Sequence, residues 1–164
     1  MTEKNIKNPT FIHLDVNSEY SIGKSVVRID ELLDECINEG IPAVGIADHG
    51  NLFSAYKIYK RAIKKGIKPI IGVTLSVQSE TSKSDYKLIL LCKDKLGYEN
   101  LSHLITRSYV EGYHLGEAKI KMKWINNKNA EGLVAISAYH EGIIQSLMLS
   151  NKESEVENQI NFLK

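Results

Sequence analysis

The sequence predicts an α/β fold in which short buried strands alternate with amphipathic helices. Short apolar runs recur along the chain, and the segments between them carry apolar residues at the i, i+3, i+4 spacing of a helix. The runs lack polar–apolar alternation, as expected of strands that are covered on both faces. Strands joined through helices run parallel with right-handed crossovers, so we expect a layered or barrel arrangement.

The first half of the chain is expected to hold two strands and two helices. The strands are 11–16 (FIHLDV) and 42–48 (PAVGIAD), and the helices are 28–40 and 51–65. In the first helix the apolar residues at helical spacing are Ile29, Leu32, Leu33, Cys36 and Ile37. Gly40 and Gly66 follow the two helices, which is typical of helix ends.

The second half continues the same pattern with three further strands. These are 68–77, 86–93 and 131–139; the expected helices are 96–112 and 142–149, and a polar loop is expected at 78–85. About five strands result, fewer than the eight or so that close a TIM-like barrel. The last segment, SEVENQINFLK, has an amphipathic helical pattern that continues to Lys164. This indicates either a surface helix that frays or the front part of a larger protein.

Composition sets the broad class. The 164 residues suffice for one domain with a core, after a tail at residues 1–10 that lacks the apolar segment of a signal peptide. No stretch approaches the roughly 18 apolar residues of a membrane span. Cys36 and Cys92 lie in apolar contexts without CxxC spacing, so we expect a reducing, cytoplasmic location and no disulfide. The net charge of +1 does not by itself indicate nucleic-acid binding.

Candidate functional residues follow the strands, because side chains at the carboxyl ends of parallel strands meet at one edge. Asp48 and His49 stand there in the stretch GIADHGN. They are half of a metal site, or Asp48 or Asn51 caps the next helix while Gly50 adopts a positive φ. His13 alternates with apolar residues and is expected to be a core or edge histidine.

Three residues have the side chains of good metal ligands, namely Asp15, Asp48 and His49. Asn17 and Thr74 offer neutral oxygens that hold transition metals poorly, so a catalytic two-metal cluster is not expected. GxSxG, P-loop and GxGxxG motifs are absent from the sequence, and neither cysteine has a base beside it. No catalytic residue is therefore assigned.

A basic run lies in the second helix. It comprises Lys57, Lys60, Arg61, Lys64 and Lys65, followed by Lys68. Such a run is either a solvated helix face or a strip that contacts phosphate or DNA.

Four stretches, in this order and spacing, resemble the N-terminal region of bacterial replicative DNA polymerase III alpha subunits. They are FIHLDVNSEYS, IPAVGIADHGNLFSAYKIYKRAIKKGIKPIIGV, LILLCKDKLGYENLSHLITRSYVEGY and EGLVAISAY. That region is a PHP (polymerase and histidinol phosphatase) domain. The resemblance implies a distorted TIM-like barrel of about seven strands, of which residues 11–164 would be the N-terminal portion.

The resemblance also implies what has become of the metal site of this family. The family's HxH falls on Asp15 and Asn17, and its Asp-His pair matches Asp48 and His49. A glutamate, a histidine and a cysteine of the family fall on Thr74, near Lys87 and near Tyr139. The implied site is degenerate, with Asp48 and His49 hydrogen-bonded to each other's neighbours. No cofactor is expected; the alternative is a weakly bound Zn, Mn or Mg ion.

By resemblance, the parent protein is a DNA-directed DNA polymerase whose palm is absent from this chain. The chain would then be a scaffold that binds the rest of the alpha chain, the proofreading exonuclease subunit and other replisome subunits, and that reaches DNA through the parent. Two alternatives remain: a metal-dependent phosphoesterase or exonuclease using Asp15, Asp48 and His49, and direct DNA contact through the basic run.

Overall fold

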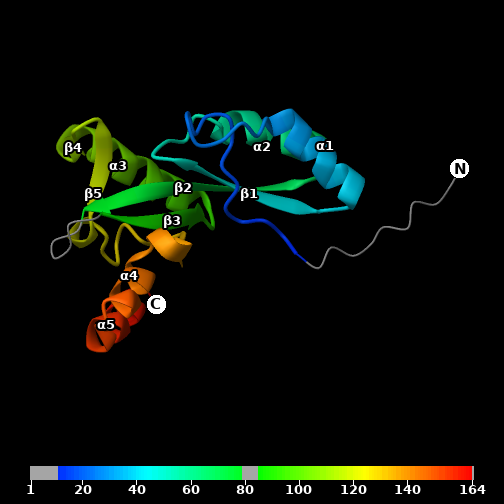
Figure 1. Cartoon of the computed structure of the whole chain (residues 1–164). Helices are drawn as coiled ribbons and strands as arrows, with labels where there is room; N and C mark the ends of the chain where they lie inside the picture. The colour runs from blue at the N-terminus through cyan, green and yellow to red at the C-terminus, as the bar shows by residue number, and fades with distance from the viewer. Residues whose placement is uncertain (1–10, 79–84, 164) are drawn as a thin grey trace, which may run out of the picture. The chain divides into compact units, whose positions relative to one another are not determined.

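The computed structural model describes residues 11–78 and 85–163 and divides the chain into two compact units (Figure 1). The first unit is Met1–Val73 and the second is Thr74–Lys164. The expected tail at residues 1–10 and most of the expected loop at 78–85 lie outside the described residues. The expected domain bounds, 11–164, stay a prediction.

The first unit contains two helices and β1, together with the beginning of β2. The elements are α1 (Ile29–Glu39), β1 (Ala43–His49), α2 (Ala55–Lys64) and the first part of β2 (Lys68–Gln78), with which β1 pairs. Gly40 ends α1 with φ 70°, as expected of a C-cap. Helix α2 begins four residues later than expected. The Phe53 N–H donates to Oδ1 of Asn51 at 3.0 Å, which forms a turn before the helix, and the N-cap position is taken by Ser54.

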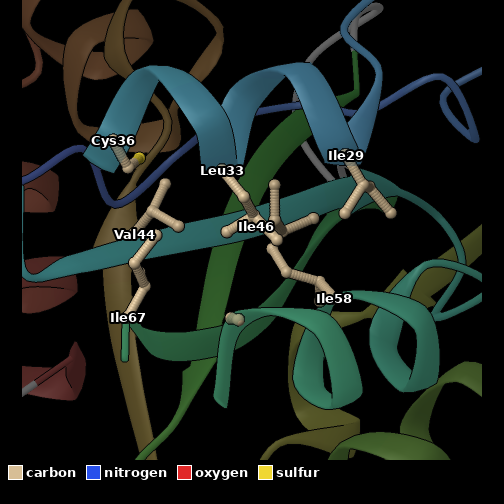
Figure 2. Close-up of a cluster of buried hydrophobic side chains, with 8 residues drawn as sticks. Ile29, Leu33, Cys36, Val44, Ile46, Ile58 and Ile67 are labelled. Carbon is tan, nitrogen blue, oxygen red and sulfur yellow. The ribbon is translucent and has the colours of Figure 1, made fainter. Parts of the chain in front are cut away.

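The core of the first unit lies where α1 and α2 pack against β1, as Figure 2 shows. Its buried side chains are Ile29, Leu33 and Cys36 from α1, Val44 and Ile46 from β1, and Ile58, Ala62 and Ile67 from α2 and the residues after it. The helical spacing of the α1 residues places them on one face, which the sequence predicted. Burying each large aliphatic side chain stabilises the unit by about 1.5–3 kcal/mol.

The expected strand at 11–16 is wrong. The segment makes a single parallel bridge, from Val16 to Ile46, and the side chains of Phe11, His13 and Leu14 are exposed. His13 is therefore neither a core nor an edge-strand histidine. The segment lies so close to β1 that a Cβ on Gly45 would sit 2.6 Å from the Leu14 carbonyl oxygen, so backbone contact rather than side-chain burial holds it.

The second unit contains the remaining strands and helices. After the end of β2 come β3 (Tyr86–Cys92), α3 (Lys95–Glu111), β4 (Tyr113–His114), β5 (Glu117–Lys121), β6 (Leu133–Ser137), α4 (Ile143–Leu149) and α5 (Glu153–Leu163). Short 3-10 turns occupy Met122–Trp124 and Tyr139–Glu141. Helix α5 forms where the amphipathic pattern of the last segment predicted it.

The sheet is mixed, so the expectation of an all-parallel arrangement is wrong. Its order in the described residues is β4-β5-β2-β3-β6, an open path in which β2 and β5 are parallel but β4 with β5 and β3 with β6 are antiparallel. A parallel connection needs a dozen or more residues, and the segment 79–85 between β2 and β3 is too short for one. The sequence analysis also missed β4 and β5, a hairpin whose turn contains Leu115 and Gly116, both at positive φ.

Helix α3 is fixed at its start by two local features. Asp94 caps it, with Oδ1 accepting from the Gly97 N–H at 2.9 Å. Gly97 also packs directly on the backbone of Gly132, since a Cβ on Gly97 would lie 1.8 Å from the Gly132 carbonyl oxygen. Across the part of the chain that the structure describes, none of the helices combines the length and apolar character that crossing a membrane demands.

Candidate functional site

The candidate site of the first unit is built around Asp48 at the end of β1. Six of the seven β1 residues are buried, including Asp48, whose side chain is fully shielded from solvent. A buried carboxylate is costly unless hydrogen-bond donors surround it. The folding of this unit must therefore bring donors to Asp48.

Three serine hydroxyls and one backbone amide supply those donors. Ser18 donates from its N–H to Oδ1 at 2.7 Å, and its hydroxyl lies 2.9 Å from Oδ1 and 2.8 Å from Oδ2. The Ser21 hydroxyl donates to Oδ1 at 2.7 Å, and the Ser54 hydroxyl donates to Oδ2. These four groups, here called the serine nest, match in number the roughly four lone-pair sites of a carboxylate.

The neighbours of Asp48 are also engaged with the backbone. The His49 N–H donates to the Ser21 hydroxyl oxygen at 3.0 Å, and Nδ2 of Asn17 donates to the Ala47 carbonyl at 2.8 Å. Gly50 has φ 69°, as the sequence predicted for the turn after the strand. Asp15 lies on the exposed segment before Val16. Asp48 thus serves neither as a helix cap nor as an open ligand; it accepts from the serine nest.

The other predicted ligand positions lie in the second unit. Thr74 is half-buried, whereas Tyr139 is 86% exposed and has φ 47°. Nζ of Lys87 donates to the Ser76 hydroxyl at 2.6 Å and to Oε1 of Glu117 at 2.9 Å. Its side chain is 13% exposed, so Lys87 is a largely buried cation with a fixed counter-ion.

Glu117 is the centre of this second cluster. Its Oε1 also accepts from the Ser76 hydroxyl, and its Oε2 lies 3.8 Å from Nζ of Lys119, which pairs with Asp85 at 2.5 Å. Burial alone would raise the pKa of Glu117, but the hydrogen bonds from Ser76 and Lys87 and the charges of the two lysines lower it to about 2. Glu117 therefore stays ionised over the whole neutral range.

Among the described residues, no group of three or more His, Cys, Asp or Glu side chains is arranged to hold a metal ion. Ser21, Ser54 and Glu117 were missed by the sequence analysis. A usable signal existed for one of the serines: an aspartate at the end of a fully apolar run must find donors, and the stretch NSEYS offers two serine hydroxyls, those of Ser18 and Ser21.

Some members of the basic run on α2 form ion pairs with acidic side chains of the same unit. Lys57 pairs with Glu19 at 2.6 Å, and Arg61 and Lys65 pair with two carboxylates one turn apart on α1, Asp30 and Asp34. The hydrogen bond that Lys57 donates to Glu19 raises the pKa of Lys57. Three of the five predicted phosphate or DNA contacts are thus occupied by acidic side chains of the same unit.

Comparison with known proteins identifies the family. The PHP domain model matches residues 13–164, and the chain belongs to the PHP domain family. Its relatives include the DNA polymerase III subunit alpha of Borreliella burgdorferi, which is 38% identical over 163 residues covering 94% of this chain and 14% of the relative. The subunit of the same name from Pseudomonas aeruginosa is 37% identical over 149 residues, covering 90% and 13%.

The chain therefore spans about one seventh of the length of these relatives, and matches their N-terminal region. Among solved structures, an amidohydrolase from Chromobacterium violaceum aligns with a TM-score of 0.44 at 18% identity, covering 85% of this chain and 49% of that chain. That score is too low to support an argument about the fold.

Proposed function

We propose that this chain is the N-terminal PHP module of a cytoplasmic replicative DNA polymerase alpha subunit, and that it acts as a structural and partner-binding module, not as a hydrolase. The relatives support this choice of parent protein, because over a third of the aligned positions are identical and the alignments cover 90% or more of this chain. The observation that carries the non-catalytic role is the serine nest.

The chemistry of the nest opposes metal binding. To ligate a divalent ion, Asp48 would have to give up hydroxyl donors that fill both of its oxygens, in a site with no access to water. A second family ligand falls near Lys87 by resemblance; Lys87 pairs with Glu117, and a cation there would repel an incoming metal. Each unit, taken by itself, supports the proposal: hydrogen bonds occupy Asp48 in the first unit, and an ammonium group with its counter-ion occupies the surroundings of Lys87 in the second.

The proposal includes partners, by analogy with the family. The module would bind the rest of the alpha chain and the proofreading exonuclease subunit of the replisome, and it would meet DNA through the parent protein. Folded packing and an exposed surface suffice for this role, because interface energetics do not require a metal.

Metal titration and turnover test the proposal. We expect isothermal titration with Zn²⁺, Mn²⁺ and Mg²⁺ to give no stoichiometric binding, and p-nitrophenyl phosphate to be hydrolysed no faster than with His49→Ala. Stoichiometric metal with phosphate release that His49→Ala abolishes would instead establish the phosphoesterase alternative, with Asp15, Asp48 and His49 as ligands. Co-purification with the exonuclease subunit from the same cell tests the partner role separately.

A further inference from the structure

Helix α2 presents an unusually apolar side to solvent. Its buried side carries Ala55, Ile58 and Ala62. The opposite side of the helix and Phe53 in the turn before it are here called the α2 face, whose exposed residues are Phe53, Tyr56, Tyr59, Lys60, Ile63 and Lys64. From Tyr56 onward these positions follow i, i+3, i+4, i+7 and i+8, so the side chains form one continuous stripe.

The apolar members of the α2 face are well exposed. Phe53 is 72% exposed, Tyr56 73%, Tyr59 57% and Ile63 56%. Single exposed apolar residues are ordinary, but two tyrosines and an isoleucine along one helix, with a phenylalanine in the turn before it, are typical of an interaction site. Aromatic side chains are also enriched at the centres of protein interfaces, where they supply most of the binding energy.

The charges of α2 are segregated between its sides. Lys57, Arg61 and Lys65 are matched by acidic side chains of the first unit. Lys60 and Lys64, which belong to the α2 face, make no ion pair within the described part of the chain. Nζ of Lys60 lies 5.7 Å from the centre of the Tyr56 ring. The face therefore combines apolar rings with two unmatched positive charges, and α2 itself contains no acidic residue.

We propose that the α2 face docks an acidic amphipathic segment of a protein partner. Apolar side chains of that segment would cover Tyr56, Tyr59 and Ile63, and its carboxylates would meet Lys60 and Lys64. The inference rests on the proposed function as a partner-binding module and specifies where, and by what chemistry, such a partner binds.

The same observations favour a protein over single-stranded DNA. A strand of nucleic acid needs a continuous cationic track for its phosphates. Here three of the basic side chains on α2 are neutralised by Glu19, Asp30 and Asp34. Ile63, near the C-terminal end of the stripe, offers no ring on which a base could stack.

Selection from a random peptide display library against the whole chain tests the inference without a known partner. We expect the enriched peptides to be rich in Asp and Glu, with apolar residues at helical spacing. Their affinity, measured by fluorescence anisotropy, should fall roughly tenfold or more in Tyr59→Ser. Ile22→Ser is the matched control, because Ile22 is an exposed apolar residue of the same unit outside α2, and it should leave affinity unchanged.

Charge reversal tests the chemistry. The double variant Lys60→Glu with Lys64→Glu should weaken the selected peptides, and a peptide with Lys in place of its acidic residues should regain affinity for that variant. All these substitutions are at exposed positions, and circular dichroism checks that the variants fold.

Three results would overturn the inference: no enriched peptide, peptides whose binding survives Tyr59→Ser, or an oligothymidine probe that binds the chain and loses affinity in Tyr56→Ser. If no peptide binds the α2 face and the chain also binds no metal, only this inference fails. Stoichiometric metal with phosphatase turnover removes the proposed function itself, so the two failures are distinguishable.

Discussion

Replacing Asp48 by asparagine tests whether the serine nest stabilises the first unit. The substitution keeps the size of the side chain but turns one acceptor oxygen into an NH₂ donor. The Ser54 hydroxyl then faces a donor, and the bonds from Ser18 and Ser21 change from charge-assisted to neutral. A hydrogen bond to a charged group contributes about 1.5–3 kcal/mol and a neutral one about 1 kcal/mol.

The expected loss follows from those values. Three weakened bonds (from the Ser18 N–H, the Ser18 hydroxyl and the Ser21 hydroxyl) and one lost bond, less the relief of no longer burying a charge, lower the free energy of unfolding by about 2–3 kcal/mol. Asp30→Asn is the matched control: it changes the same group in the same unit, but its ion pair with Arg61 is about half exposed, so the effect should stay below about 0.5 kcal/mol.

Urea titration followed by far-ultraviolet circular dichroism is the assay. The single tryptophan, Trp124, lies in the second unit, so its fluorescence does not report on the surroundings of Asp48. EDTA should change the unfolding curve of neither wild type nor Asp48→Asn, since the nest needs no ion. If Asp48→Asn were as stable as Asp30→Asn, the nest would not carry the stability assigned to it.

Three further predictions concern the second unit. The pKa of Glu117 lies at about 2, below its ordinary 4.5, so its contribution to the free energy of unfolding is present above pH 4.5 and is lost as the pH falls toward 2. In acid titrations, Glu117→Gln should lack about 1 kcal/mol of this pH dependence, a value discounted for the 40% exposure of the side chain. Equal profiles of stability against pH for wild type and variant would refute it. In urea unfolding, Gly97→Ala should destabilise the protein by about 2–3 kcal/mol, because its Cβ would overlap the Gly132 carbonyl. Gly116→Ala, in open space at positive φ, should cost about 1 kcal/mol. A smaller loss for Gly97→Ala than for Gly116→Ala would contradict the close packing of Gly97 on Gly132. Burial, with a smaller contribution from Asp94, raises the pKa of Cys92 to about 11, so iodoacetamide at neutral pH should alkylate it far more slowly in native than in urea-unfolded protein; equal rates would show that the thiol is accessible.

The regular elements of the fold could be predicted wherever the pattern was long. Helices α1 and α3 and strands β1, β2 and β3 lie within a residue or two of their expected bounds, because each presents a whole face or run of apolar residues to a core. The segment 11–16 has the same composition, but it forms a single β-bridge with β1 and not a continuous strand, and apolar composition alone does not reveal that.

Predicting the order of the sheet and the donors of the site requires information that the spacing of apolar residues does not contain. Strand β5 is short and carries lysines, so its apolar signal is weak, and its pairing with β2 bridges about forty residues. Asp48 was found because it ends a buried run. Two of its donors, Ser21 and Ser54, were not predicted, because the sequence does not distinguish a loop serine that will contact the carboxylate from one that will not.

The segment after Val16 is fastened to the end of β1 by its side chains. Ser18 and Ser21 bind Asp48, and these contacts lie before Lys24, whose neighbours Ile22 and Gly23 are exposed together with it. Trypsin cleavage after Lys24 would therefore cut the chain without releasing the piece that precedes the cut. The nicked protein should elute as one species from a sizing column and separate into two bands only in denaturing gel electrophoresis.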